Sequence, residues 1–163
     1  MKRVTDLILN FGTKANDTIV GTASAEKIFG YKGHDVLIGG AGDDRLNGGG
    51  GDDYISGNQG NDILRGGRGA DTFVFDGDFD ADLVRDFNAC QDDALQFVLY
   101  QPEAIDWTAE TLLGMCAQSG KDVVLAIADT DERVTFKNLT LDHFDASDFE
   151  VIHYQAEGVD LLA

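Results

Sequence analysis

The sequence predicts an all-β protein in which short parallel strands wind into a solenoid. Residues 12–74 divide into seven consecutive blocks of nine residues, with no insertion between them. The first position of every block is Gly, the sixth is acidic and the eighth is a large apolar residue. A fixed period in three columns indicates a repeat architecture. The alternative is a flexible linker rich in Gly and Asp, but a linker has no reason to keep an apolar residue at every ninth position.

Each block supplies a tight turn and a short strand. Six Gly-rich residues followed by three others are too few for a helix, whereas a short strand can point its eighth-column side chain inward. Glycine allows the positive φ angles that such a turn requires. Two blocks make one coil, so residues eighteen positions apart should stack at the strand spacing of roughly 4.8 Å. The expected core residues are Ile19, Ile28, Leu37, Leu46, Ile55, Leu64 and Phe73.

The acidic column predicts cation sites, because stacked carboxylates repel each other unless a cation lies between them. Carboxylate and carbonyl oxygens form a hard environment that suits calcium rather than zinc or copper. The stacked pairs are expected to be Asp17/Asp35, Asp35/Asp53 and Asp53/Asp71 on one edge, and Glu26/Asp44, Asp44/Asp62 and Asp62/Asp80 on the other. The predicted metal-site residues are Asp17, Gly30, Gly33, Asp35, Gly39, Gly42, Asp44, Gly48, Gly51, Asp53, Gly57, Gly60, Asp62, Gly66, Gly69, Asp71, Asp80 and Asp82.

The five blocks from Gly30 to Val74 resemble the G-G-x-G-x-D-x-U-x repeat of RTX (hemolysin-type calcium-binding) proteins. The GADTFVF run and the segment with Asp82, Val84, Asp86 and Phe87 also resemble the C-terminal modules of secreted serralysin-type proteins. The resemblance implies a right-handed parallel β-roll that binds about four to six Ca²⁺ ions. It also implies that Asp82 or Asp86 completes the last site, with a polar edge strand as the alternative.

The first two blocks depart from this repeat. Thr13, Ala15, Thr22 and Ser24 stand at glycine positions, and Glu26 replaces Asp. A Cβ at these positions disturbs the turn, so we expect the sites here to be empty or absent.

The chain divides into an N-terminal cap segment (1–11), the β-roll (12–80) and a C-terminal capping and secretion region (81–163). In the last region, strands are expected at 94–100, 122–128 and 133–136, with a final strand ending at Ile152. Thr108 should cap one short helix that runs to about Gln118 and stops before Gly120. Outward positions of the odd blocks are apolar, at Val20, Val36, Ile38, Tyr54 and Val74, and we expect the terminal segments or a partner to cover them.

Composition excludes several function classes. A net charge of −18 argues against a nucleic-acid partner. Cys90 and Cys116 form no disulfide framework or zinc signature. The three histidines, His34, His143 and His153, are isolated, and neither H-E-x-x-H nor G-x-S-x-G occurs, so no catalytic residue is assigned and no enzymatic activity is expected. No apolar run approaches the length of a membrane span.

These observations predict a calcium-binding module that is unfolded in the calcium-poor cytosol and folds outside the cell. The resemblance to secreted RTX proteins implies that it serves the secretion, folding and stability of a protein exported by a type I secretion apparatus, and we expect a monomer. By resemblance, the tail Val159–Ala163 ends an uncleaved C-terminal secretion signal. The alternative is a secreted, calcium-dependent polysaccharide-binding or adhesion module, similar to the repeat modules of alginate-modifying enzymes, with calcium bridging to an anionic polysaccharide.

Overall fold

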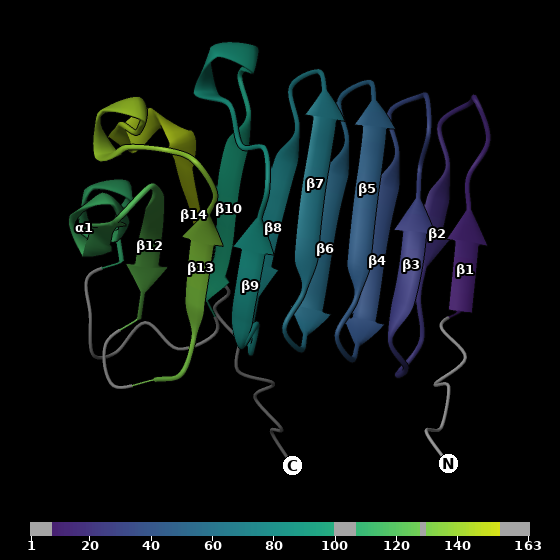
Figure 1. Ribbon diagram of the computed structural model, residues 1–163, viewed down its shortest axis with the longest axis horizontal. Coiled ribbons are helices and arrows are strands. Elements are labelled where there is room, and N and C mark those ends of the chain that lie inside the picture. The colour runs from purple at the N-terminus through teal and green to yellow at the C-terminus, as the bar shows by residue number, and fades with distance from the viewer. Residues whose placement is uncertain (1–7, 100–106, 128–129, 154–163) are drawn as a thin grey trace, which may run out of the picture.

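A two-sheet parallel solenoid forms the body of the protein, as the sequence predicts (Figure 1). The structure is a computed structural model that describes residues 8–99, 107–127 and 130–153. Strands eighteen residues apart pair in parallel, so that Val36 lies opposite Tyr54 and Arg45 opposite Ile63. Consecutive blocks therefore alternate between the two sheets, and two blocks make one coil.

The first sheet has the strand order β1-β3-β5-β7-β9-β13-β12-β11 and the second has the order β14-β10-β8-β6-β4-β2. The strands of the first sheet are β1 (Ile8–Phe11), β3 (Glu26–Phe29), β5 (Arg45–Gly50), β7 (Ile63–Arg68), β9 (Ala81–Val84), β11 (Cys116–Ser119), β12 (Asp122–Ala126) and β13 (Arg133–Phe136). Those of the second are β2 (Thr18–Val20), β4 (Val36–Ala41), β6 (Tyr54–Gln59), β8 (Thr72–Asp76), β10 (Ala94–Leu99) and β14 (Phe149–His153).

The eighth column of the repeat forms the core between the sheets. Ile28, Leu37, Leu46, Ile55, Leu64 and Phe73 are at most 2% exposed, whereas Ile19 in the first coil is only partly buried. Inward side chains stack on their neighbours along the solenoid axis because the parallel register repeats every eighteen residues. The core is therefore one side chain wide and as long as the solenoid.

The residues after the repeats extend both sheets and widen the core, as expected. Strand β13 pairs in parallel with β9, while β10 and β14 continue from β8. Strands β11, β12 and β13 pair antiparallel and lie at the far end from β1 (Figure 1). Aromatic rings fill this end, with Phe75 and Phe97 stacked at 4.9 Å and Phe87 and Phe144 at 5.1 Å between ring centroids.

The predicted helix is present but shorter than expected. Helix α1 spans Ala109–Met115, and the Thr108 side chain caps it by accepting a hydrogen bond from the Thr111 N–H. The extension to Gln118 is wrong, because Cys116–Ser119 form β11 and pair with β12. Gly120, with φ of +65°, takes the turn between β11 and β12 instead of ending the helix.

Three short 3₁₀ helices, Ala89–Gln91, Leu141–His143 and Ala146–Asp148, complete the described elements. Met1–Leu7 and the suggested secretion tail Val159–Ala163 lie outside the described residues. Ile8–Phe11 form β1, a strand of the solenoid in register with β3.

The expected cover over the odd blocks is only partly present. Val74 is 3% exposed, but Val20 is 61% exposed and Tyr54 is 36% exposed. Val36 and Ile38 are half-buried. Over the first coil the described residues leave this outer face open at Val20, and its cover by a partner or by terminal residues outside the described ranges stays a prediction.

We expect Ile55→Ala to lower the free energy of unfolding by about 2–5 kcal/mol, because the substitution opens a cavity in a core one side chain wide. Ile63→Ala is the matched control, since Ile63 lies on the outer face and is half-buried. Chemical denaturation of both variants in saturating calcium checks this. Equal losses for the two variants would contradict the assignment of the eighth column to the core.

Candidate metal centre

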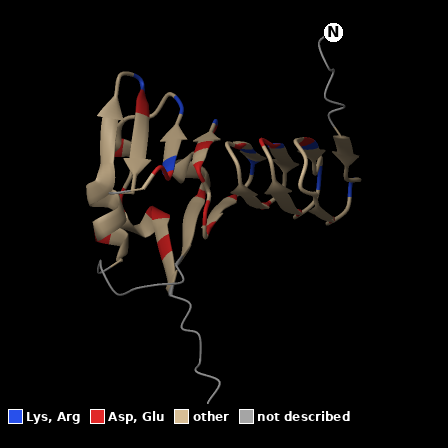
Figure 2. Ribbon diagram, turned by 90° about the horizontal axis from the view of Figure 1, so that it is seen from below, with Lys and Arg blue, Asp and Glu red and all other residues tan. Residues whose placement is uncertain are grey.

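The acidic column forms a continuous hydrogen-bonded ladder along each edge of the solenoid. In each step, the main-chain N–H of one acidic residue donates to Oδ1 of the Asp in the next coil. Figure 2 shows acidic residues recurring at the turns of the solenoid. The N–H to Oδ1 distances are 2.8 Å for Asp17 to Asp35, 2.8 Å for Asp35 to Asp53 and 3.0 Å for Asp53 to Asp71 on one edge, and 2.7 Å for both Glu26 to Asp44 and Asp44 to Asp62 on the other.

The second oxygen of these carboxylates is buried without a hydrogen-bond partner. Among the described residues this holds for Oδ2 of Asp35, Asp44, Asp53, Asp62, Asp71 and Asp82. An ionised carboxylate only accepts hydrogen bonds, and an unpaired buried charge is costly. Each of these oxygens therefore requires either a proton or a cation.

Glycine at the first and fourth columns makes room for these turns. A Cβ on Gly57 would lie 2.0 Å from Oδ2 of Asp62, so the first column must stay bare for the carboxylate to fit. Gly51 has φ of +124°, and a Cβ there would lie 2.0 Å from the carbonyl oxygen of Gly33 in the neighbouring coil. The remaining predicted glycines repeat these two environments at Gly30, Gly33, Gly39, Gly42, Gly48, Gly60, Gly66 and Gly69.

The first two turns satisfy their acids in another way. Oδ2 of Asp17 accepts hydrogen bonds from the Thr13 N–H at 2.6 Å and from the Thr13 hydroxyl at 2.9 Å. Glu26 accepts from the Thr22 N–H at 2.9 Å and from the Thr22 hydroxyl. The threonines that break the repeat thus supply protein donors to the oxygens that are unpaired in the later turns.

The ladder continues beyond the repeats through residues with irregular spacing. The Asp62 N–H donates to Oδ1 of Asp82 at 2.8 Å, twenty residues on, so the predicted stacking of Asp80 on Asp62 is wrong. The ladder step from Asp62 to Asp82 is twenty residues instead of eighteen, so the coil that contains β8 and the turn after it is two residues longer than a repeat coil. Asp80 lies in this turn with φ of +47°, and its Oδ2 accepts from the Gly60 N–H.

Sequence reasoning missed Asp93 and left Asp82 and Asp86 as alternatives. Oδ1 of Asp93 accepts from the Asp71 N–H at 3.0 Å, and its Oδ2 accepts from the Asn88 N–H at 2.8 Å. Asp93 stands 22 residues after Asp71, so no nine-residue period points to it. Asp86 lies outside the ladder, where it binds the Arg65 side chain and the Gly66 N–H.

Burial changes the acidity of the ladder. Loss of solvent raises the pKa of Asp44 and Asp53 to about 6, that of Asp62 to about 7 and that of Asp82 to about 9. Neighbouring carboxylates add to each increase, while the main-chain hydrogen bond to Oδ1 opposes it. Neutral pH therefore lies close to the pKa of Asp62 and below the pKa of Asp82.

The donor set fits a hard cation. No cluster of three or more His, Cys, Asp or Glu side chains suited to a metal occurs within the described ranges, so side chains alone cannot surround an ion. Two carboxylates per site together with main-chain carbonyl oxygens of the Gly-rich turns would give the all-oxygen shell that calcium prefers. Thiol and imidazole ligands are absent from the described part of the ladder.

Cysteine and histidine residues outside the ladder form no further candidate site among the described residues. Cys90 and Cys116 are free thiols, and burial raises the pKa of Cys116 to about 11. His34 lies at an exposed turn, where its Nδ1 accepts from the Asp52 N–H. No helix within the described segments has the length and apolar character needed to cross a membrane.

We expect the metal-free protein to gain stability as the pH falls from about 8 to about 5. The folded-state pKa values of Asp44, Asp53, Asp62 and Asp82 lie above the ordinary value of an aspartate, so folding takes up protons in this interval. The β-sheet content of chelator-treated protein, measured by circular dichroism at several pH values, should therefore rise on acidification. A loss of β-sheet content over this interval would contradict the expectation.

Comparison with known families supports the ladder as a metal-binding repeat. Residues 11–46, 38–73 and 47–84 match the family model of the RTX calcium-binding nonapeptide repeat. No curated protein matches the chain.

Similar solved structures include the extracellular lipase LipA from Serratia marcescens, at 19% identity and a TM-score of 0.43. That match covers 87% of this chain and 40% of the lipase, so this chain spans less than half of the lipase's length. They also include the AlgE6R3 and AlgE6R2 subunits of the Azotobacter vinelandii mannuronan C5-epimerase, both at 26% identity. Their TM-scores are 0.33 and 0.36, and the matches cover 93% and 91% of this chain and 84% and 94% of those chains.

The family match spans the repeat blocks whose glycines and carboxylates form the ladder. The roll of this chain is made of RTX calcium-binding nonapeptide repeats.

Proposed function

We propose that this chain is a module that folds outside the cell when calcium binds to its ladder, and that this folding serves the export and stability of a protein secreted by a type I apparatus. One observation carries the proposal. Six buried carboxylate oxygens in consecutive turns have no hydrogen-bond partner among the described residues. Cations at these positions would offset the cost of burying these unpaired charges.

Four stacked pairs have unpaired oxygens on both members. They are Asp35/Asp53 and Asp53/Asp71 on one edge, and Asp44/Asp62 and Asp62/Asp82 on the other. We assign one calcium ion to each pair, with carbonyl oxygens of the turns that begin at Gly30, Gly39, Gly48, Gly57 and Gly66 as the remaining ligands. Bound calcium would supply positive charge where the carboxylates meet.

Asp17 takes part in no such pair, because Thr13 satisfies its second oxygen. Asp80 also lies outside the four pairs, since Asp82 occupies the ladder position. Both residues were predicted as ligands from the sequence, and neither is included in the proposed sites.

Coupling between metal binding and folding follows from the charge of the ladder. The carboxylates of successive coils are buried, and their Oδ2 atoms have no hydrogen-bond partner among the described residues. Extracellular calcium modules bind with dissociation constants of about 10⁻⁴–10⁻³ M, far above cytosolic calcium. A chain with such sites would cross a secretion channel unfolded and fold on the other side.

The regions beyond the roll fit this role as a cap. The described residues of this region extend both sheets through strands β9 to β14, and α1 packs against β12 and β14. We propose that this region closes the end of the roll that faces away from β1. A secretion signal in Val159–Ala163 remains a proposal from the sequence.

We expect Asp53→Asn to lower the calcium stoichiometry by about two ions and to raise the calcium concentration at half-folding about tenfold, because Asp53 belongs to two pairs. Asn keeps the Oδ1 acceptor for the Asp35 N–H and replaces only the unpaired oxygen. Calorimetry and far-ultraviolet circular dichroism during a calcium titration of chelator-treated protein test this. The proposal fails if the unsubstituted protein is rich in β-sheet without calcium and its circular dichroism spectrum does not change when calcium is added.

Asp52→Asn is the matched control for that variant. Asp52 precedes Asp53 in the same turn, its side chain is 58% exposed, and its Oδ1 accepts from the Ala70 N–H. Asn can preserve that hydrogen bond. Calcium stoichiometry should be unchanged, and an equal effect of the two substitutions would contradict the assignment of the unpaired oxygen.

We further expect Asp17→Asn to leave the number of bound calcium ions unchanged, because the Thr13 N–H and hydroxyl already satisfy its Oδ2. Calorimetric stoichiometry is the measurement. Loss of an ion in this variant would show that the first coil binds calcium after all.

A further inference from the structure

Basic side chains gather on the outer face of one sheet, although the chain carries a net charge of −18. The outward positions of β3, β5, β7 and β9 and the residue after β9 hold Lys27, Phe29, Arg45, Asn47, Ile63, Arg65, Leu83 and Arg85, none of which is acidic. The equivalent positions of β2, β4, β6 and β8 on the other sheet hold no charged residue at all. We call the first set, together with Lys137, the cationic face.

The parallel register arranges the cationic face in lines across the strands. Lys27 lies opposite Arg45 on adjacent strands. Arg65, Arg85 and Lys137 follow on three further neighbouring strands, as the hydrogen bonds from the Arg85 N–H to Leu64 and from the Lys137 N–H to Val84 fix. Within each line, neighbouring cations are separated by one strand spacing of roughly 4.8 Å. Lys27 and Arg45 belong to one line and Arg65, Arg85 and Lys137 to a second, because Arg45 lies opposite Ile63 and Arg65 lies opposite Asn47.

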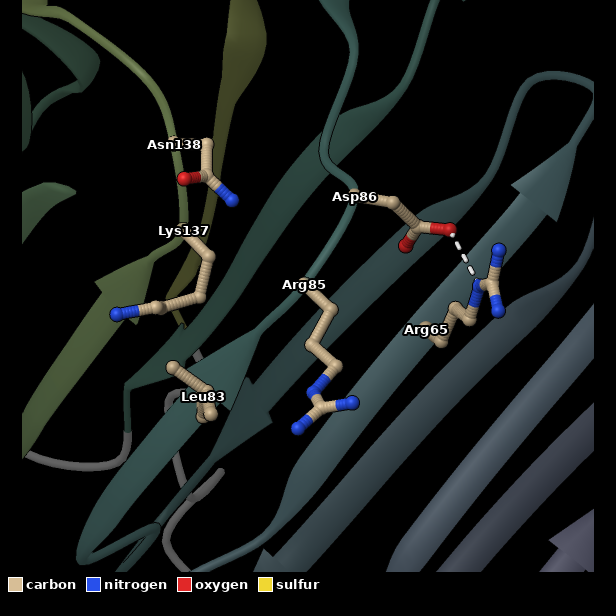
Figure 3. Close-up of a pocket in the computed structure, with 6 residues that line it drawn as sticks. All are labelled: Arg65, Leu83, Arg85, Asp86, Lys137 and Asn138. Atoms are coloured by element: carbon tan, nitrogen blue, oxygen red, sulfur yellow. Dashed lines mark hydrogen bonds and ion pairs between the residues drawn. The ribbon is translucent and has the colours of Figure 1, made fainter. Parts of the chain in front are cut away.

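Two shallow depressions run along this face and share Arg65 and Arg85. One, of about 390 Å³, is lined by Arg65, Leu83, Arg85, Asp86, Lys137 and Asn138 (Figure 3). The other, of about 270 Å³, continues toward Lys27 and Phe29. Together they form a groove that crosses the strands at the surface of the roll.

Most of the cations in this groove have no acidic partner. Asp86 pairs with Arg65 at 3.0 Å, and Asp122 pairs with Lys137. Lys27, Arg45 and Arg85 form no ion pair or side-chain hydrogen bond with another described residue, and Figure 3 shows the Arg85 guanidinium free of its neighbours in the depression. Three unpaired cations in a strongly acidic protein point to an anionic ligand.

We propose that the cationic face binds a linear polysaccharide that carries acidic groups, laid across β3, β5, β7 and β9. The repeated cations match a polymer with regularly spaced negative charges, and Asn47 and Asn138 add donors and acceptors suited to hydroxyl groups. An extended acidic peptide fits less well, because peptides join a sheet through a free edge and this is a sheet face. Nucleic acid has a denser charge, which the overall charge of −18 opposes.

This inference goes beyond the proposed calcium-dependent folding and rests on it in one respect, since the face exists only when the roll is folded. Calcium in the ladder would also reduce the negative field that surrounds the groove. Asp86 links the two features, because it binds both Arg65 and the N–H of Gly66 in the turn that contains Asp71.

The test is binding of a galacturonic acid hexamer to calcium-saturated full chain, measured by calorimetry at low salt, with a heparin hexasaccharide in a second arm. The Arg45→Gln/Arg85→Gln variant removes two cations that have no ion-pair partner among the described residues. It should weaken the affinity for whichever hexamer binds the unsubstituted protein by about tenfold or more. The Lys32→Gln/Lys121→Gln variant removes the same charge from exposed turns and should change it less than about twofold. Preference for one hexamer identifies carboxylate or sulfate as the acidic group.

Calcium titration of every variant, followed by circular dichroism, separates the two proposals, because an unaltered calcium-induced fold shows that only the face has changed. The cationic face is rejected if neither hexamer binds, if a neutral dextran hexamer binds equally, or if both double variants lose the same affinity. Tighter binding of a glutamate oligomer of equal charge would replace the polysaccharide with an acidic peptide and overturn the proposal.

Discussion

The main-chain hydrogen bond from one acidic residue to Oδ1 of the next stacked Asp is the interaction on which the roll depends. It fixes the eighteen-residue register, because each N–H finds its acceptor only when the coils are aligned. The same bond draws the carboxylate inside and leaves its second oxygen unpaired. The same side chain thus sets the register and creates the need for a cation. A roll without cations can keep this register only by burying unpaired negative charge.

The sequence was sufficient to predict the repeat, the two-sheet stacking, the core column and most of the ladder. These features follow from a strict period, so the position of Asp53 determines those of Asp35 and Asp71. After Val74 the nine-residue period ends, so ligand positions could no longer be predicted from spacing. Asp82 replaces Asp80 because the chain from Asp62 to Asp82 is two residues longer than a repeat coil, and Asp93 lies beyond a 3₁₀ helix that no repeat could indicate. The helix was overextended because the pairing of Cys116–Ser119 with β12 is a tertiary preference.

The two sheets share a core and differ in their outer surfaces. Inward residues obey the same rule in both, since each coil must bury one large apolar side chain per strand. Outward residues need not be apolar, and their charge differs between the two sheets. The outer face of β2, β4, β6 and β8 is uncharged, whereas the opposite sheet carries the cationic face. A regular solenoid therefore separates its two tasks, with metal ligands confined to the edges and the broad faces available for recognition.

The threonine-closed turns of the first coil mean that the resistance of the roll to unravelling varies along its axis. Thr13 and Thr22 hold their acids by hydrogen bonds whose strength is independent of dissolved calcium, and the aromatic cluster of Phe87, Phe136 and Phe144 holds the opposite end. Each coil between them gains a stabilising contribution that grows with the logarithm of the ion concentration. As calcium is withdrawn from the proposed sites, the middle coils therefore lose stability before the two ends of the roll do.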